Sequence, residues 1–272
     1  MKTILITGAS DGIGAEAARE LHASGENVII VGRSLEKTKA IASELGAPYY
    51  VADFTKLSEV RQLAADIRKD VARIDVLVNN AGGIFGKREI TEDGHEKTMQ
   101  VNHLAPFLLT NLLIDILVAS NATVINTSSI ANKILSKFDI NDIEVEKNYS
   151  PEVAYGNSKL ENILFTKELN RRYGQAGIST VAFHPGNVAT NFANGSGSLM
   201  RFIYSTFLSK LFLISPKKGA DTLVWLALTA PGKDWTLGEY YVKRKISTQV
   251  NPIANDGDVA RELWDWSEEV VK

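Results

Sequence analysis

The chain has 272 residues, of which 44% are apolar and 23% carry a charge, and its formal net charge is −2. This composition is typical of a globular protein with a buried core. It lacks the basic excess of a nucleic-acid-binding surface, so we expect no nucleic-acid partner. The absence of cysteine excludes disulfides, zinc–thiolate sites and a cysteine nucleophile. The four histidines are scattered without metal-ligand spacing, and we therefore expect no metal site.

Apolar runs in this sequence are short. None approaches the ~20 residues that a membrane-spanning helix needs. The apolar run at residues 3–7 is also too short for the core of a signal peptide, and a glycine turn follows it at once. We therefore expect a cytoplasmic protein without a transmembrane segment.

Short apolar runs alternate with longer segments whose apolar residues recur with helical periodicity. This alternation indicates β-α-β units, a parallel sheet and helices on both of its faces. We expect a single α/β domain over residues 1–272, a Rossmann-like doubly wound parallel sheet whose strand ends share one ligand-binding edge. The expected strands are 3–7, 27–32, 49–52, 75–79, 123–127, 179–183 and 239–242, and the expected helices are 14–24, 35–45, 58–71, 94–118, 152–173 and 259–271.

One insertion interrupts this pattern. Residues 191–198 are rich in Asn, Gly and Ser, and residues 199–214 are apolar and aromatic. We expect a mobile lid at about 191–215 that closes over an apolar substrate. A pair of ordinary amphipathic core helices and shallow contact with a membrane surface are the alternatives.

A glycine-rich turn joins the first expected strand to the first helix. Its spacing, G-x3-G-x-G, lets the backbone approach a pyrophosphate closely, and the following helix N-terminus offers free N–H groups. A glycine turn without a ligand is the alternative. The candidate cofactor-binding residues in this turn are Gly8, Ser10, Asp11, Gly12, Ile13 and Gly14.

The second expected strand ends at Gly32, and Arg33 and Ser34 follow it. A protein that selects NAD commonly has an acidic residue here, which bonds the ribose 2′-hydroxyl. A guanidinium and a hydroxyl instead suit the 2′-phosphate of NADP(H). The sequence therefore favours NADP(H), with Arg33 as a solvated surface charge being the alternative.

Tyr155 and Lys159 stand four residues apart in an expected helix and so share one face. A free tyrosine has a pKa of ~10, too high for efficient proton transfer at neutral pH, and a neighbouring ammonium favours its phenolate. The pair therefore predicts an acid/base centre. Ser128 and Ser129 follow the expected strand 123–127, where a hydroxyl can polarise a substrate oxygen or cap a turn.

Pro106 interrupts the long expected helix 94–118. Proline has no N–H for the carbonyl four residues earlier, which here belongs to Asn102, and it kinks a helix. The carbonyl oxygen of Asn102 is therefore predicted to lack its hydrogen bond within the helix. A bent core helix without a functional role is the alternative.

Taken in chain order, these motifs resemble those of the short-chain dehydrogenase/reductase family. The resemblance rests on the T-G-x3-G-x-G loop, N-N-A-G at residues 79–82, the strand-end serines, Y-x3-K, and P-G-x3-T at residues 185–190. It implies that Ser129 rather than Ser128 polarises the substrate oxygen. It also implies that Asn102 holds a water in a proton relay to Lys159.

The resemblance implies further cofactor contacts. Asp53 would hold the adenine amino group, or alternatively cap the helix that begins near Thr55. Members of the family often pair through the helices that carry Asn102 and Tyr155, so a homo-oligomer is also expected. The remaining implied cofactor contacts are Asn80, Ala81, Gly82, Tyr155, Lys159, Pro185, Gly186, Val188 and Thr190.

Within this family the chain resembles the retinol dehydrogenase-like branch. Ser129 and Tyr155 are 26 residues apart, a longer gap than in the shortest members, and the insert carries F-D-I-N-D at residues 138–142. Residues 155–169 are similar to the branch's Y-x-x-S-K-L-x-N-x-L-F-x-x-E-L, and residues 215–222 resemble its segment after the lid.

We therefore expect an NADP(H)-dependent oxidoreductase of class EC 1.1.1.-, a carbonyl reductase that interconverts an apolar small-molecule aldehyde or ketone, bulky enough to need the lid, with its alcohol. Tyr155 would be the general acid/base, and Ser129 would stabilise negative charge on the substrate oxygen. A catalytically silent NADP(H)-binding sensor on the same fold is the alternative. Loss of Tyr155 or Lys159 would mark such a sensor, and both are present.

Overall fold

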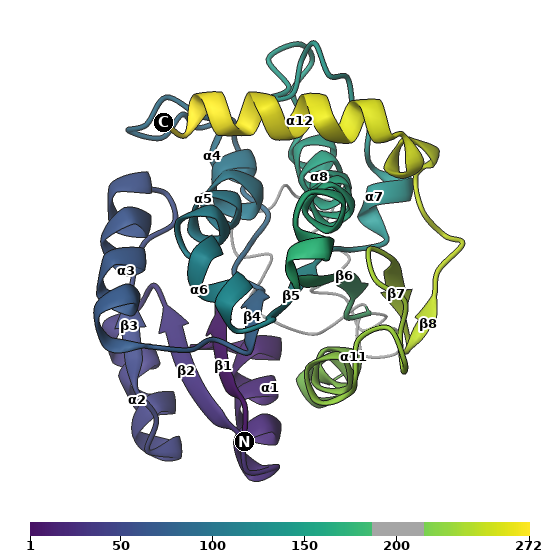
Figure 1. Ribbon diagram of the computed structural model, residues 1–272. Helices are drawn as coiled ribbons and strands as arrows, with labels where there is room; N and C mark the ends of the chain where they lie inside the picture. The colour runs from purple at the N-terminus through teal and green to yellow at the C-terminus, as the bar shows by residue number, and fades with distance from the viewer. Residues whose placement is uncertain (187–214) are drawn as a thin grey trace.

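A mostly parallel β-sheet forms the centre of the computed structural model, which describes residues 1–186 and 215–272 (Figure 1). The strand order is β3-β2-β1-β4-β5-β6-β7-β8, and only the β7–β8 pair is antiparallel. The doubly wound Rossmann-like sheet expected from the sequence is confirmed, whereas β8 was not expected. The strands are β1 (Thr3–Thr7), β2 (Asn27–Gly32), β3 (Tyr49–Val51), β4 (Val76–Asn79), β5 (Thr123–Thr127), β6 (Ser179–His184), β7 (Tyr240–Val242) and β8 (Lys245–Ile246).

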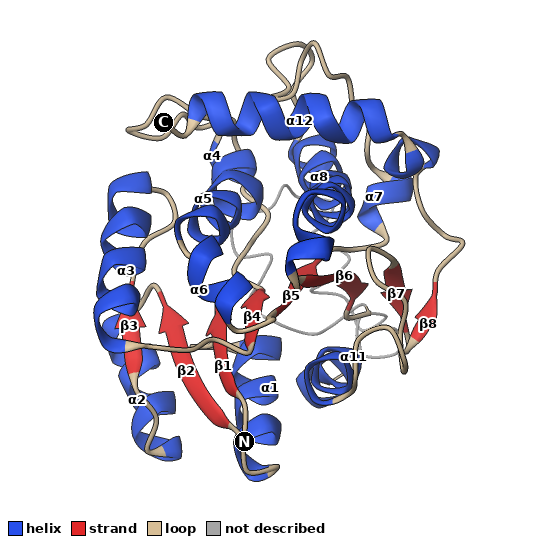
Figure 2. Cartoon of the chain, viewed as in Figure 1, coloured by secondary structure: helices blue, strands red, loops and turns tan. Residues whose placement is uncertain are grey.

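Helices cover both faces of this sheet (Figure 2). They are α1 (Gly12–Ala23), α2 (Leu35–Leu45), α3 (Leu57–Asp70), α4 (Lys97–Met99), α5 (Ala105–Leu112), α6 (Ile114–Ala119), α7 (Ala131–Ile134), α8 (Pro151–Tyr173), α11 (Pro216–Leu228) and α12 (Gly257–Val270). Successive strand side chains point to opposite faces of a sheet. Accordingly, Leu5 packs in one core cluster with residues of α3, α5, α8 and α12, while Ile4 and Ile6 pack in a second cluster with residues of α1, α2 and α11.

The prediction of one continuous helix over residues 94–118 is wrong. The structure divides this stretch into α4, a π-helical turn (Gln100–Leu104), α5 and α6. Ala105 donates its N–H to the carbonyl of Gln100, five residues back, and Pro106 then lies in the first turn of α5, where proline needs no N–H partner. The proline therefore starts a new helix after a π-turn instead of kinking one long helix.

Helix α8 carries the Y-x3-K motif and is buried around its whole circumference, from Ala154 to Thr166. Ser150 caps its N-terminus by accepting the N–H of Val153 at 3.1 Å, and Pro151 occupies its first position. The sheet lies on one side of α8, and α12 crosses the other side (Figure 1). This enclosure fixes the orientation of the side chains on α8.

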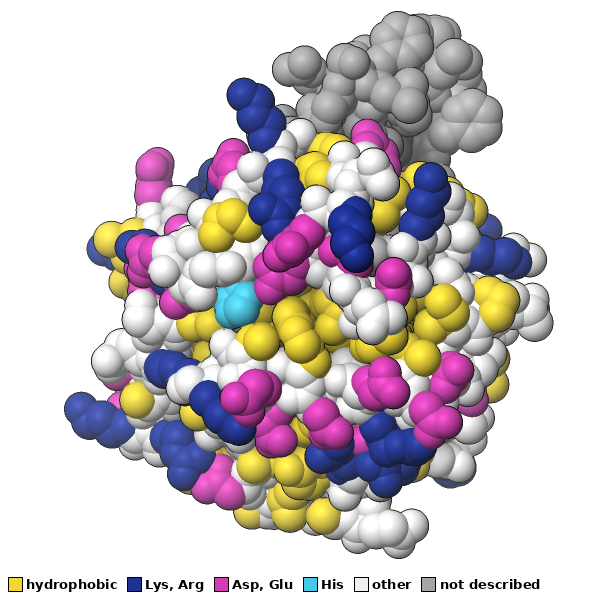
Figure 3. Space-filling view, turned by 90° about the horizontal axis from the view of Figure 1, so that it is seen from above, with side chains coloured by type: hydrophobic (Ala, Val, Ile, Leu, Met, Phe, Trp, Pro, Cys, Tyr) yellow, Lys and Arg dark blue, Asp and Glu magenta, His cyan; other side chains and the backbone are white. Residues whose placement is uncertain are grey.

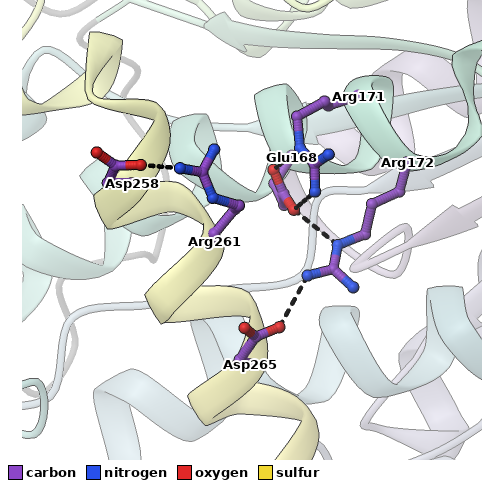
Figure 4. Close-up of polar contacts among 6 residues, drawn as sticks. All are labelled: Glu168, Arg171, Arg172, Asp258, Arg261 and Asp265. Atoms are coloured by element: carbon purple, nitrogen blue, oxygen red, sulfur yellow. Dashed lines mark hydrogen bonds and ion pairs between the residues drawn. The ribbon is translucent and has the colours of Figure 1, made fainter.

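Aromatic packing, a cation–π contact and salt bridges hold the C-terminal helix α12 against α5 and α8. Trp264 packs edge-on against Phe107 of α5, with ring centres 4.9 Å apart. Arg172 of α8 lies over the Trp264 ring at 4.6 Å and also binds Asp265 at 2.8 Å. Figure 4 shows that Glu168 accepts from both Arg171 and Arg172, so this network joins the last turns of α8 to α12.

Because α12 lies across α8, a pair of copies formed through α8 would have to include α12 in its interface. Pairing through the helices of Asn102 and Tyr155 stays a prediction.

On the face seen from the α12 side, basic and acidic side chains are intermixed around a band of apolar ones (Figure 3). Among the described residues, no helix combines the length and apolar character needed to cross a membrane.

Candidate active site

The carboxyl ends of β1 and β4 are locked together beneath the glycine-rich turn. The Oγ1 atom of Thr7 accepts the N–H groups of Asn80 and Ala81, each at 3.0 Å. A side chain on Gly14 would lie 2.4 Å from the carbonyl oxygen of Gly8 and 2.7 Å from Nδ2 of Asn80. The loop can pass this close to Asn80 only with glycine at position 14.

The same turn leads into the N-terminus of α1. Asp11 caps this helix, since its Oδ1 atom accepts the N–H of Gly12 at 2.8 Å. Gly12 has a φ of +55°, which glycine adopts without strain. The unpaired N–H groups and the dipole of this helix end suit a diphosphate, with Ser10 and Ile13 in the same turn. The donor set therefore fits the dinucleotide expected from the sequence.

The end of β2 explains why this chain has no acidic side chain there. A Cβ on Gly32 would lie 2.4 Å from Oγ1 of Thr38 and 2.7 Å from Oγ of Ser10, so no side chain fits at this position. Arg33 and Ser34 follow and are exposed. Ser34 caps α2 by accepting the N–H of Lys37 at 3.4 Å. The hydroxyl hydrogen of Ser34 stays available to a ligand, because the capping bond uses only the hydroxyl oxygen.

Asp53 follows β3 and shapes a turn. Its Oδ1 atom accepts the N–H of Thr55 at 3.0 Å and the hydroxyl of Thr55 at 2.9 Å. Helix α3 begins only at Leu57, with Lys56 in the capping position, so Asp53 is not the cap of that helix. The turn uses one carboxylate oxygen of Asp53, and the adenine contact stays a prediction.

Tyr155 and Lys159 lie together on the buried face of α8. The Nζ atom of Lys159 is 5.5 Å from the centre of the Tyr155 ring, and it donates to the carbonyl oxygen of Thr127 at 3.3 Å. Asn162 donates to the same Thr127 carbonyl at 3.0 Å. The end of β5 therefore holds the ammonium beside the tyrosine, as the four-residue spacing predicts.

Burial perturbs the lysine of this pair. Only 2% of Lys159 is exposed, and this desolvation lowers its pKa to about 8; the nearby Glu161 carboxyl opposes the shift only to the extent that it is ionised. A lysine whose pKa lies near the working pH can hold and return a proton, which is the property that an acid/base centre requires. No sequence pattern predicts this lowered pKa, because it depends on how completely α8 is enclosed.

The two strand-end serines have different surroundings. Ser128 is buried, and its hydroxyl donates to the carbonyl oxygen of Lys159 at 2.6 Å. Ser129 is half-buried, and its Oγ accepts the N–H of Ala131 at 3.2 Å, which leaves its hydroxyl hydrogen for another acceptor. These surroundings favour Ser129 over Ser128 as the hydroxyl that donates to a substrate oxygen. Ser129 also caps the turn into α7.

Two features that sequence reasoning missed fix Ser129 in place. Asn132 of α7 is fully buried, and its Nδ2 donates to the carbonyl oxygen of Ser129 at 2.6 Å. Gly156, next to Tyr155, lets the segment that follows α7 approach α8, because a Cβ there would lie 2.5 Å from the backbone nitrogen of Ser136. Neither residue stands in a motif whose spacing could have singled it out.

Asn102 lies within the π-turn and clamps the loop that follows β4. Its amide donates to the carbonyl of Gly83 and to Oγ of Ser158, both at 2.9 Å, and its Oδ1 accepts the N–H of Gly83 at 2.8 Å. A Cβ on Gly82 would lie 2.8 Å from Oδ1 of Asn102 and 3.4 Å from Nζ of Lys159. The structure thus brings Asn102, Gly82 and Lys159 together, while the relay water stays a prediction.

The last expected cofactor segment is described only in part. Pro185 and Gly186 follow β6 at the same edge of the sheet, and Gly186 has a φ of +92°, in the region that favours glycine. Val188, Thr190 and most of the expected lid at about 191–215 lie outside the described residues. No cluster of three or more potential metal ligands occurs within residues 1–186 and 215–272.

Residues 2–198 match the short chain dehydrogenase family. The chain belongs to this family. It is 40% identical to DnrU of Streptomyces sp. (strain C5), provisionally described as a daunorubicin C-13 ketoreductase, over 99% of this chain and 92% of that protein. It is 37% identical to retinol dehydrogenase 13 of Homo sapiens, over 99% of this chain and 84% of that protein.

A solved structure agrees with these sequence relationships. A protein from Mycobacterium paratuberculosis, itself described as uncharacterized, superimposes with a TM-score of 0.78 at 32% identity, over 100% of this chain and 93% of that one. The resemblance to short-chain dehydrogenases and to their retinol dehydrogenase-like branch is therefore confirmed. The protein is an oxidoreductase that acts on alcohol or carbonyl substrates with a nicotinamide dinucleotide.

Proposed function

We propose that the protein is an NADP(H)-dependent carbonyl reductase for bulky apolar aldehydes or ketones. One observation carries the proposal: the ammonium of buried Lys159 lies 5.5 Å from the ring of Tyr155, close to the strand end that presents Ser129. A proton donor, its charge partner and a hydrogen-bond donor for the substrate oxygen thus gather at one edge of the sheet.

In the proposed reaction, Ser129 donates a hydrogen bond to the carbonyl oxygen and stabilises the charge that develops there. When bound, the reduced nicotinamide supplies the hydride that forms the new C–H bond. Tyr155 gives its phenolic proton to the oxygen, which completes the alcohol. The positive charge of Lys159 stabilises the phenolate left behind. Oxidation of an alcohol is the reverse of these steps.

The choice of NADP(H) is supported at the end of β2. Position 32 cannot hold the acidic side chain that bonds a ribose 2′-hydroxyl, because a Cβ there would lie 2.4 Å from Thr38. Arg33 is exposed and makes no ion pair among the described residues, so its guanidinium is available to a 2′-phosphate. Both features favour NADP(H) over NAD(H).

An apolar substrate is supported by the surroundings of Tyr155. Ile84, Ala131 and Leu135 form a small apolar cluster with this tyrosine, separate from the two main cores. The relatives named above are described as a daunorubicin C-13 ketoreductase and a retinol dehydrogenase, and both names support a bulky substrate. We also propose that the protein is cytoplasmic.

The test measures NADPH consumption by the purified protein with short aldehydes, long apolar aldehydes including retinal, quinones and steroid ketones. NADH and the Tyr155→Phe variant run in parallel. We expect turnover that depends on NADPH, rises with the apolar size of the substrate and disappears in the variant. Tight NADPH binding without turnover across the panel would favour the silent sensor, and failure to bind either nucleotide would overturn the proposal.

A further inference from the structure

Two adjacent tyrosines of β7 lie on opposite faces of the sheet. Tyr240 packs in the core cluster that contains Leu160 and Ile163 of α8, whereas Tyr241 packs in the cluster that contains residues of α11. Tyr240 is paired with Ala182 of β6, and α8 and α7 pack together over this face (Figure 1). The side chain of Tyr240 therefore points to the same side of the sheet as the helix of the catalytic tyrosine.

The hydroxyls of these two tyrosines have different surroundings. The Oη atom of Tyr241 accepts the N–H of Thr236 at 2.9 Å. The Oη atom of Tyr240 is buried and has no hydrogen-bond partner within residues 1–186 and 215–272. A buried hydroxyl without a partner lowers stability, and a phenylalanine ring would fill the same place without this loss. The unpaired hydroxyl of Tyr240 therefore indicates a role other than packing.

Asn132 of α7 shows where the Tyr240 hydroxyl lies relative to the reacting groups. It is close enough to this hydroxyl to oppose in part the rise of the Tyr240 pKa. Its own polar atoms are engaged elsewhere: Nδ2 donates to the carbonyl oxygen of Ser129 at 2.6 Å, and Oδ1 accepts a backbone N–H at 2.9 Å. The preceding residue, Ala131, packs against Tyr155. The Tyr240 hydroxyl thus lies near the contact of α7 with α8 that holds Tyr155.

Tyr155 and Tyr240 interact electrostatically. Burial raises the pKa of Tyr240 well above its usual value, and negative charge on Tyr155 raises it further. Tyr155, which has the Lys159 ammonium beside it, is therefore the phenol that ionises, while Tyr240 keeps its proton. Two further titratable groups lie near Tyr240 in the sheet. His184 of β6 is neutral at working pH because burial lowers its pKa to about 4, and Lys245 of β8 is exposed.

We propose that Tyr240 is a positioning residue of the acid/base centre, whose hydroxyl hydrogen turns towards Tyr155 when Tyr155 is ionised and stabilises that charge. This inference rests on the role of Tyr155 in the proposed function. In carbonyl reduction Tyr155 gives its proton to the substrate oxygen, and Tyr240 loses none, since only its O–H bond rotates. Before that step Tyr155 is neutral and offers no charge to the hydrogen, in agreement with the unpaired hydroxyl in the structure.

The experiment follows the ionisation of Tyr155 directly. The protein is labelled at Cζ of tyrosine, saturated with NADP⁺ without substrate, and titrated by NMR, with Tyr155→Phe used to assign the resonance. The variants compared are Tyr240→Phe and, as a matched control, Tyr241→Phe, which removes a hydroxyl from the other face of the same strand. Thermal unfolding of each variant detects structural damage.

We expect Tyr240→Phe to raise the pKa of Tyr155 by about half to one pH unit, because the phenolate loses a hydrogen donor. This variant should melt no lower than the parent, since the hydroxyl it loses is unpaired. Tyr241→Phe should melt lower, because the N–H of Thr236 loses its acceptor, and should leave the titration of Tyr155 unchanged. With an alcohol substrate, the acidic limb of kcat/KM should move to higher pH in Tyr240→Phe by the same amount.

An unchanged titration of Tyr155 in Tyr240→Phe would overturn the inference. An equal change in Tyr241→Phe would refute it as well, because the effect would then come from repacking of β7. Failure of the proposed function gives a different result. In that case Tyr155 of the parent protein titrates as a free tyrosine does, or Tyr155→Phe keeps full turnover.

Discussion

The hydroxyl of Ser128 donates a 2.6 Å hydrogen bond to the carbonyl oxygen of Lys159. This bond ties the end of β5 to the middle of α8 and occupies the hydroxyl hydrogen of Ser128. The next residue, Ser129, makes its bond as an acceptor and keeps its hydroxyl hydrogen. Two adjacent serines with the same side chain are therefore expected to differ in role, one bracing the helix and the other facing the substrate.

Replacement of these serines should separate stability from catalysis. Ser129→Ala removes the donor to the substrate oxygen, and we expect kcat to fall on the order of 10²–10³-fold with little change in melting temperature. Ser128→Ala removes this buried hydrogen bond while the helical bond to the Lys159 carbonyl remains, and we expect a loss of ~0.5–1.5 kcal/mol of unfolding free energy. Steady-state kinetics and urea unfolding of both variants measure the two effects. Reversed behaviour of the pair would assign the catalytic hydroxyl to Ser128.

The buried lysine should set the alkaline limit of carbonyl reduction. Burial lowers the pKa of Lys159 to about 8, so its ammonium is present below this pH and is lost above it. We expect kcat/KM for reduction to be level below pH 7.5 and to decline above about pH 8, since this parameter reports groups of the free enzyme. Circular dichroism at each pH serves as the control for unfolding. A level profile through pH 9.5 would contradict this assignment.

Glu161 is expected to make stability depend on pH. This carboxyl is buried on α8, and neither of its oxygens has a hydrogen-bond partner within the part of the chain that the structure describes; burial together with Glu96 and Glu144 raises its pKa well above the usual value. The folded state then keeps a proton that the unfolded chain releases above a pH of ~4.3, so stability falls as pH rises from there towards the folded pKa. Glu161→Gln removes this dependence.

We therefore expect Glu161→Gln to melt higher than the parent at pH 8.5, and to gain less or nothing at pH 5. Thermal unfolding at both values measures the difference. Glu262→Gln provides a control on α12, because Glu262 is exposed. The assignment of a protonated Glu161 fails if its replacement changes the melting temperature equally at the two pH values.

The close packing behind Gly32 should make this position intolerant of any side chain. A Cβ there would lie 2.4 Å from Oγ1 of Thr38, which is buried and fixed by a 2.6 Å bond to the carbonyl of Ser34. We expect Gly32→Ala to cost ~1–3 kcal/mol in denaturant unfolding and to weaken NADPH binding by displacing the start of α2. Gly174→Ala is the control, since its nearest contact would be an ordinary 3.4 Å. Equal stability of the two variants would show that the β2 end adapts.

The order of strands and helices could be predicted from sequence because periodicity and glycine turns are local signals. The ranges expected for β1, β2 and β5 coincide with those of the structure, and the Tyr155–Lys159 spacing places both side chains on one face of a helix. The glycine turn, Arg33 and the strand-end serines were also identified as candidates, because each follows directly from residue type and position next to a strand end.

Tertiary structure decided what local patterns do not encode. The pKa of Lys159 depends on burial by segments far along the chain, and the difference between Ser128 and Ser129 depends on which backbone groups lie across from β5. The salt bridge between Lys37 and Asp11 joins residues 26 positions apart, which only the pairing of β1 with β2 brings together. The π-turn at Asn102 lies against α8, and Pro106 alone did not reveal it. The sequence determined the elements and the chemical groups of this protein, whereas their burial and partners, and hence their charges and roles, were decided by contacts between distant segments.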